Sequence, residues 1–335
     1  MPNSRSVLLG VPVPGDHLGL AWSAGADVSA AELGALAGRS RIADTGQMVS
    51  PAAVLQRVFL PARELSPDLL GHFTLAGRAS DGSLAAIGTV RVTAEATRHT
   101  AAIRAFVDPS WRGRGIGRAL LRWQDATAMA MFAKGRAEAS AIGVPIAASM
   151  IDRRRLYAAA GFSSATRVEM VARPLGDSSD PIEIEPEGTA APGWPTRGLA
   201  RADHGRVSEL LGSVADPHAF LVSGLTTQEL VAAADPALSR VVLHEGEVRG
   251  GILVDAVPAE RRGQNASVLG LVLDSADHRV AQGFLADMVR TLWAAALGEV
   301  TIALTPAIAR TWASALAAQS YRSIALDPLY TIELP

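Results

Sequence analysis

Residues 106–121 read Phe-Val-Asp-Pro-Ser-Trp-Arg-Gly-Arg-Gly-Ile-Gly-Arg-Ala-Leu-Leu. The apolar run that leads into this stretch, residues 101–107, is broken by Pro109. After a basic, glycine-rich turn, an apolar helical period begins at Ile116. The stretch therefore predicts a strand, a turn and the start of a helix.

The composition of the turn suits an anion. Gly113, Gly115 and Gly117 leave backbone N–H groups unshielded, and arginines stand beside them. The start of a helix adds unpaired N–H groups and partial positive charge. The sequence therefore predicts a site for a phosphate or pyrophosphate, and the alternative is a glycine-rich surface turn.

Two common phosphate-binding motifs do not fit this turn. A dinucleotide-binding fingerprint that began at Gly113 would need glycine at position 118, which is Arg118. A Walker A loop needs Gly-Lys-Ser/Thr, and Lys134 is the only lysine in the chain. The turn belongs to neither class.

The hexapeptide Arg112-Gly-Arg-Gly-Ile-Gly117 resembles the Arg/Gln-x-x-Gly-x-Gly/Ala signature of the GNAT superfamily of N-acetyltransferases. The resemblance implies that one strand holds the pantetheine arm of acetyl-CoA and that the amides of the turn hold its pyrophosphate. The residues it assigns to these contacts are Ala105, Phe106, Val107, Arg112, Gly113, Arg114, Gly115, Ile116, Gly117 and Arg118.

A second segment, Leu156-Tyr-Ala-Ala-Ala-Gly-Phe162, is similar to the Leu-Tyr-x-x-x-Gly-Phe landmark of the same family. The resemblance implies that Tyr157 is the general acid, with its hydroxyl near the thioester sulfur. The alternative is a tyrosine that packs at a helix end. The family often has an asparagine seven residues earlier, where this chain has Met150, so Ser149 or Asp152 would have to replace that pantetheine contact.

The sequence does not identify a general base. The strand over residues 100–107 has Arg104 as its ionisable residue, so the carboxylate that some members of the family use there is absent. Glu95 and His99 fall at the far turn, where we expect solvated side chains. A base that acts through water, or one from the second half, stays open.

Composition limits the other possibilities. A length of 335 residues suits two domains, and a net charge of −2 gives no global signal for nucleic acid or membrane. The absence of cysteine excludes disulfides and cysteine zinc sites. Residues 1–20 show neither a signal peptide nor an anchor, so we expect a cytoplasmic protein. Arginine in place of lysine suggests a GC-rich bacterial genome. No metal is expected, because His204, His218, His244 and His278 lack the spacing of a metal site.

The first half predicts the element order β-α-α-β-β-β-α-β-α-β, which is similar to the GNAT fold. Residues 29–32 have the spacing of a capping box, and Ser50-Pro51 predicts a second helix capped by the serine. Asp81-Gly82-Ser83 predicts a hairpin. Residues 145–160 predict a helix that ends at Gly161.

Residues 177–196 are rich in Asp, Glu, Pro, Gly and Ser, which predicts a linker. Beyond them a strand is expected to open at residues 198–200, and the pattern of the first half returns when Asp274 is aligned with Asp108. This alignment pairs Arg112 with His278, Gly115 with Ala281, Gly117 with Gly283 and Tyr157 with Leu316. The pyrophosphate signature and the hydroxyl of the tyrosine are thus lost in the second copy.

We therefore predict two tandem GNAT folds of the α/β (α+β) class, each a mixed, mostly antiparallel sheet flanked by helices. Residues 1–176 would form the catalytic domain and residues 197–335 a degenerate copy; the alternative is that the second half is an unrelated α/β domain. The predicted function is acetyl transfer from acetyl-CoA, without a metal, to the amine of a small molecule or protein. The alternative is a noncatalytic acyl-CoA-binding or regulatory module. Neither the acceptor nor the oligomeric state follows from the sequence.

Overall fold

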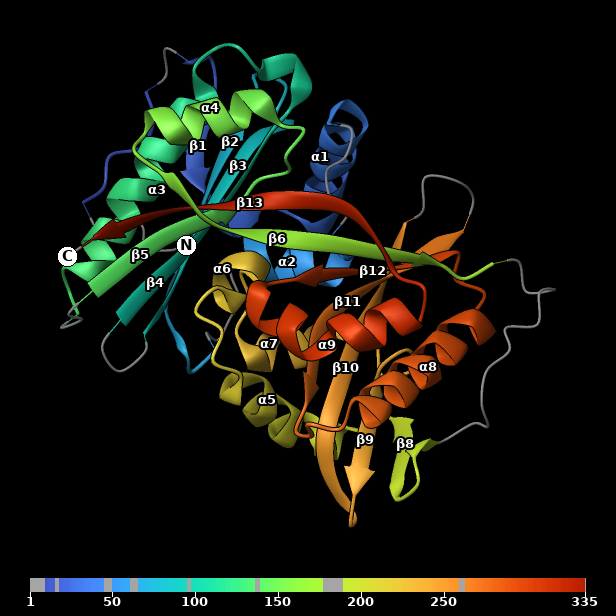
Figure 1. The fold of residues 1–335 in the computed structure, drawn as a ribbon. Helices are drawn as coiled ribbons and strands as arrows, with labels where there is room; N and C mark the ends of the chain where they lie inside the picture. Colours follow the sequence, from blue (N-terminus) through green and yellow to red (C-terminus); the bar gives the residue numbers. More distant parts are fainter. Residues whose placement is uncertain are drawn as a thin grey trace.

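The computed structural model describes residues 10–15, 18–44, 50–60, 66–94, 98–135, 139–176, 189–258 and 263–334. Within these residues, 13 strands form one continuous sheet that runs through both halves of the chain. The long strands β6 (Ser163–Pro174) and β13 (Arg322–Leu334) run side by side across the middle, and helices of each half pack on either side of them (Figure 1).

The first half has the predicted element order. Its elements before β6 are β1 (Ala21–Ala24), η3 (Gly25–Asp27), α1 (Ala30–Ala43), α2 (Ala52–Phe59), β2 (Leu69–Arg78), β3 (Leu84–Ala94), β4 (Arg98–Val107), η4 (Pro109–Trp111), α3 (Ile116–Phe132), β5 (Ala139–Pro145) and α4 (Ile151–Ala159). The capping box of α1 is confirmed, since Ser29 accepts from the Glu32 amide while Glu32 accepts from the Ser29 amide.

Two helix starts in the first half were predicted wrongly. The N-cap of α2 is Pro51, with no side-chain cap, because the extended ψ of 149° at Pro51 delays the helix to Ala52. The helix predicted from residue 145 begins at Ile151 instead. Pro145 is the last residue of β5, where it pairs with Leu329.

The second half repeats the order with one additional strand, β7, and one additional helix, α6. Its elements before β13 are β7 (Thr189–Ala191), β8 (Trp194–Gly198), η5 (Arg201–Asp203), α5 (His204–Ser213), α6 (Ala219–Ser223), α7 (Thr227–Ala233), β9 (Arg240–His244), β10 (Glu247–Pro258), β11 (Gln264–Leu273), α8 (His278–Ala294), β12 (Glu299–Leu304) and α9 (Pro306–Ala318). The strand expected to open at residue 198 is β8, which ends there. The C-terminal part of the predicted linker, 177–196, forms β7 and most of β8, while residues 177–188 lie outside the described residues.

The two halves exchange their last strands. The order around the centre of the sheet is β4-β5-β13-β6-β12-β11. β13 therefore pairs with β5 of the first half, from Leu329 opposite Pro145 to Leu334 opposite Ser140. In return β6 pairs with β12 of the second half, from Leu304 opposite Glu169 to Glu299 opposite Pro174. Each half thus completes the sheet of the other.

Both halves contain a pair of parallel strands that separate part-way. β4 and β5 pair up to Ala102 opposite Gly143, and β11 and β12 pair up to Val268 opposite Ile302. Beyond these points the two strands of each pair diverge. The fold therefore contains two V-shaped openings, one in each half.

Apolar side chains also join the halves. Leu36 of α1 and Phe59 of α2 belong to the same buried cluster as Val207 of α5 and Val231 of α7. Separate cores lie under α3 and α4 in the first half and under α8 and α9 in the second. No helix in the described ranges is long and apolar enough to cross a membrane.

Candidate active site

The glycine turn connects β4 to α3, as predicted. Gly113 and Gly115 have φ values of 78° and 85°, in the left-handed region that favours glycine. Gly115 is the N-cap of α3 and no side chain caps that helix, so its first amides lack a side-chain acceptor. A Cβ at Gly113 would meet no atom within 4 Å. The turn therefore offers unshielded N–H groups and open space, which fits a phosphate-containing ligand.

The arginine side chains of the turn have different surroundings. Arg112 donates two hydrogen bonds to the carboxylate of Asp44, at 2.6 and 2.9 Å, and so connects the turn to the end of α1. The Arg114 guanidinium lies 4.5 Å from the ring centre of Trp111. Arg118 is exposed at the start of α3. The guanidinium of Arg112 is thus already engaged, and an anion would meet the backbone N–H groups of the turn.

The end of β4 has one unpaired backbone edge. Residues 105–107 pair with residues 86–88 of β3, but they lie beyond the part of β4 that pairs with β5. Residues 105–107 line a cavity. Residues 144–147, at and after the end of β5, line it as well. An extended chain with amide groups could continue the sheet at this edge.

Tyr157 lies in α4 with 4% of its surface exposed, and it lines that cavity. Its ring packs edge-on against Phe162. Its hydroxyl has no hydrogen bond to another described residue. Burial raises the pKa of the Tyr157 hydroxyl, while the charges of Arg153 and Arg104 act against this rise. The hydroxyl is therefore protonated at neutral pH and is available as a donor.

The cavity has a volume of about 300 Å³ and is lined by both halves of the chain. The first half contributes α2, the ends of β4 and β5, and the face of α4 that carries Tyr157. The second half contributes residues 267–271 of β11, parts of α6, and the start of α9. The V-shaped openings of the two halves thus lead into one continuous space.

Three further charged residues line this cavity, and no sequence motif links their positions. Arg104 donates to the carbonyl oxygens of Leu221 and Val222 at 2.6 and 2.8 Å, and burial lowers its pKa to about 10. Asp327 accepts from the Ala148 amide at 2.8 Å, and burial raises its pKa.

Asp216, the third of these residues, accepts from the hydroxyl of Thr305 at 2.5 Å and from the amide of His218 at 2.9 Å. Like Asp327, it belongs to the second half and reaches the cavity through contacts that are distant in sequence. No local motif marks either carboxylate, which is why sequence reasoning missed both.

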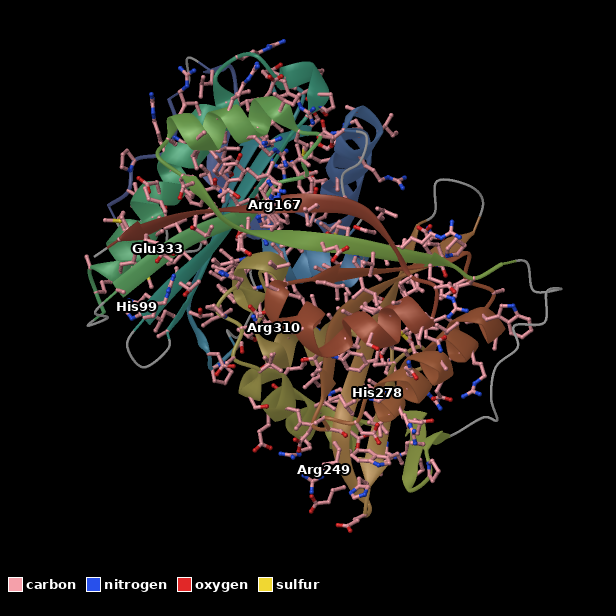
Figure 2. The ribbon with its side chains drawn as sticks, viewed as in Figure 1. His99, Arg167, Arg249, His278, Arg310 and Glu333 are labelled. Carbon is pink, nitrogen blue, oxygen red and sulfur yellow. The ribbon has the colours of Figure 1, made fainter. Side chains whose placement is uncertain are left out.

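His99, which we expected to be solvated, is buried instead. It has 6% of its surface exposed and stacks on Phe132, with ring centres 6.1 Å apart. The end of α3 covers it, because Gly135 leaves room for the imidazole. Figure 2 shows His99 at the outer end of β4, near Glu333. The other residue of that expectation, Glu95, lies outside the described residues.

The second half keeps the geometry of the tyrosine helix without the tyrosine. The amide of Tyr321 donates to the carbonyl oxygen of Leu316 at 3.1 Å, as the amide of Phe162 does to Tyr157 at 3.1 Å. These equivalent bonds agree with the alignment of Leu316 with Tyr157.

The counterpart of the glycine turn is covered in the second half. A Cβ at Gly283 would lie 1.8 Å from the carbonyl oxygen of Ala190, so β7 packs directly on α8 there. At Gly117 the nearest atom would be 3.5 Å away. His278, the counterpart of Arg112, lies at the start of α8, far from His99 (Figure 2).

Comparisons with known proteins agree with this fold. The family model described as acetyltransferase (GNAT) domain matches residues 78–164, which include the glycine turn and Tyr157. This match lies within the first half of the chain. No curated protein matches the chain.

Solved structures extend the GNAT likeness over both halves. A GCN5-related N-acetyltransferase from Sphaerobacter thermophilus aligns with a TM-score of 0.61 at 17% identity, over 96% of this chain and 97% of that one. A tandem GNAT protein from the clavulanic acid biosynthesis pathway aligns with a TM-score of 0.58 at 19% identity, over 94% and 98%. N-myristoyltransferase of Saccharomyces cerevisiae gives 0.60 at 10% identity, over 96% and 80%. The predicted fold, two GNAT folds in tandem, is confirmed.

Proposed function

We propose that this protein is an acetyl-CoA-dependent N-acetyltransferase with one donor site, in the first half of the chain. One observation carries the proposal: Gly117 of the turn, the free edge of β4 at residues 105–107, and Tyr157 all line one cavity. An acyl-CoA has a pyrophosphate, an amide-bearing arm and a thioester in that order. These three features match it in the same order.

Each group has a chemical task in this proposal. Amides from Gly113 to Arg118 bind the pyrophosphate, and the edge of Ala105, Phe106 and Val107 pairs with the pantetheine amides. The neutral amine attacks the thioester carbon, the C–S bond breaks, and the thiolate takes a proton from Tyr157. The proton that the attacking nitrogen loses passes through solvent and restores the Tyr157 hydroxyl. The raised pKa of the Tyr157 hydroxyl keeps this proton in place until the thiolate forms.

The second half has a different role in the proposal. Its turn has Arg279 and Ala281 in place of Gly113 and Gly115, β7 covers the position of Gly283, and Leu316 has no proton to donate. We therefore assign residues 1–176 to donor binding and chemistry, residues 177–196 to the connection, and residues 197–335 to a degenerate copy. This copy contributes wall to the cavity.

The alternative is a noncatalytic acyl-CoA-binding module. It is favoured by Met150, which stands where the family often has an asparagine, and by the lack of a carboxylate or imidazole in residues 100–107 of β4. Calorimetric titration with CoA, followed by incubation with acetyl-CoA and a panel of amines, separates the two. Saturable CoA binding with acetylated product supports the enzyme, and binding without product across the panel supports the module. A chain that does not bind CoA would contradict both.

A further inference from the structure

Two carboxylates of the second half line the cavity without a cationic partner. Neither Asp216 nor Asp327 has an ion pair within 4.0 Å to a lysine, arginine or histidine of the described residues. Their partners are neutral, namely one hydroxyl and two backbone amides. A carboxylate that is partly removed from water and lacks a cation is a costly feature unless a ligand supplies the charge.

The sheet brings these two carboxylates to the same end of the cavity. Asp327 on β13 lies opposite Val168 of β6. On the other side of β6, Leu304 lies opposite Glu169, and Thr305, which holds Asp216, follows directly. Strands two places apart are separated by about 10 Å. Because β6 lies between β13 and β12, the two carboxylates reach the cavity from either side of that strand.

Ser267 adds a polar group to this part of the cavity. It lies on β11 opposite Thr301 of β12, one residue before the last pair of these two strands, with 8% of its surface exposed. It lines the cavity, and its hydroxyl has no hydrogen bond to another described residue. Because this hydroxyl oxygen is accessible rather than fully buried, it is available to bond to a ligand in the cavity.

Arg104 forms no ion pair with either carboxylate. Three of its five N–H groups donate to the carbonyl oxygens of Ile103, Leu221 and Val222, which hold its guanidinium against α6. Most of the remaining wall is apolar, including Val222, Leu230 and Ile308. A volume of about 300 Å³, part of which the thioester end of the donor would fill, leaves room for a compact molecule.

We propose that Ser267, Asp216 and Asp327 form the acceptor subsite, and that this subsite takes a compact, apolar primary amine. The inference rests on the proposed acetyl-transfer function. The ammonium group binds beside these carboxylates and loses one proton to solvent before its nitrogen attacks. The apolar body lies against β11, α6 and α9. The V-shaped opening of the second half thus holds the acceptor, while that of the first half holds the acyl donor.

Equilibrium binding tests this subsite without a need for turnover. Full-length protein saturated with CoA is titrated with benzylamine and hexylamine, and in parallel with their neutral counterparts benzyl alcohol and hexanol. We expect each amine to bind at least tenfold more tightly than its alcohol. Asp216→Asn and Asp327→Asn should each weaken the amines at least tenfold and leave the alcohols unchanged. Ser267→Ala should weaken both classes a few-fold.

Controls make the failures distinguishable. Asp274→Asn removes an exposed carboxylate of the same half, beside Arg249, and should change nothing. CoA affinity and the melting temperature report whether each variant is folded. Equal binding of amines and alcohols, amine affinities that survive both aspartate variants, or preference for glucosamine or a peptide N-terminus would overturn the subsite. Failure to bind CoA would instead overturn the proposed function itself.

Discussion

Arg91 of β3 donates to the carbonyl oxygen of Gly224 at 2.6 Å and forms an ion pair with Glu229, so the second half holds a buried cation of the first half. The side chain of Arg91 is 1% exposed and that of Glu229 is 14% exposed. Removal of one partner would leave the other charge without compensation in a low-dielectric interior. The ion pair should therefore couple the stabilities of the two halves.

Arg91→Met should lower the free energy of unfolding by about 3 kcal/mol, because Glu229 loses its cation while the apolar volume is nearly kept. Urea unfolding followed by circular dichroism measures the loss. The double variant Arg91→Met with Glu229→Gln should recover part of it. If the double variant is as unstable as the sum of the single variants, the coupling between these residues is absent.

Gly115→Glu should abolish CoA binding, since it puts a carboxylate and a Cβ into the turn that would hold the pyrophosphate. The matched control is Gly246→Glu in the β9–β10 hairpin. Gly246 has nearly the same φ, 83° against 85°, so both variants suffer similar backbone strain. Calorimetry should show binding in the control and none in Gly115→Glu. Undiminished affinity in Gly115→Glu would contradict the assignment of the turn.

Tyr157→Phe should lower kcat by about 10²-fold or more and leave the Kd for CoA within a few-fold, because it removes a proton donor but little packing. Tyr321→Phe is the control, since Tyr321 is also a buried tyrosine whose hydroxyl lacks a partner among the described residues. This control should keep full turnover. An unchanged kcat in Tyr157→Phe would leave the residue a packing role.

Elements with local signals could be predicted from the sequence, whereas strand partners could not. α3 begins at Ile116 as predicted, because its glycine turn and apolar period are contained within a short stretch. β6 and β13 are each the last strand of a repeat. Nothing within either segment indicates whether it pairs with β5 of the first half or with β12 of the second. The exchange is settled by contacts between segments far apart in the chain.

The residues of the candidate site also fall into two groups, those that belong to local motifs and those that depend on contacts distant in sequence. The turn at Gly113 and Gly115 and the hydroxyl of Tyr157 belong to short motifs, so the sequence alone was enough to propose them. Asp327 reaches the cavity because β13 crosses into the first half, and Asp216 is held there by Thr305. Both depend on the strand exchange or on contacts across the sheet, which residue spacing does not encode.

The stability of the protein should decrease on acidification because of His72. Burial, followed by the charge of Arg91, lowers the pKa of His72 to about 3, and its Nε2–H donates to the Val58 carbonyl oxygen. Between about pH 6.5 and pH 3 the unfolded chain binds a proton at His72 that the folded chain excludes, so stability falls as the pH falls, by at most about 1.4 kcal/mol per unit. Urea unfolding at pH 7 and pH 5 measures this.

The matched variant for this prediction is His72→Gln, which keeps an N–H donor for Val58 but does not titrate. The difference in stability between pH 7 and pH 5 should be smaller in the variant than in the wild type. Parallel pH profiles of the two proteins would show that other groups cause the acid sensitivity.

Gly283→Ala tests the packing that replaces the phosphate turn in the second half. Its Cβ would lie 1.8 Å from the Ala190 carbonyl oxygen, so β7 must move, at a cost of about 1–3 kcal/mol. Gly205→Ala in α5, where a Cβ meets nothing within 4 Å, should instead gain up to about 1 kcal/mol. Thermal and urea unfolding compare them. Both variants should bind CoA like the wild type, because the donor site lies in the first half. A specific loss of CoA affinity in Gly283→Ala would mean that the start of α8 contributes to donor binding, which contradicts a single donor site.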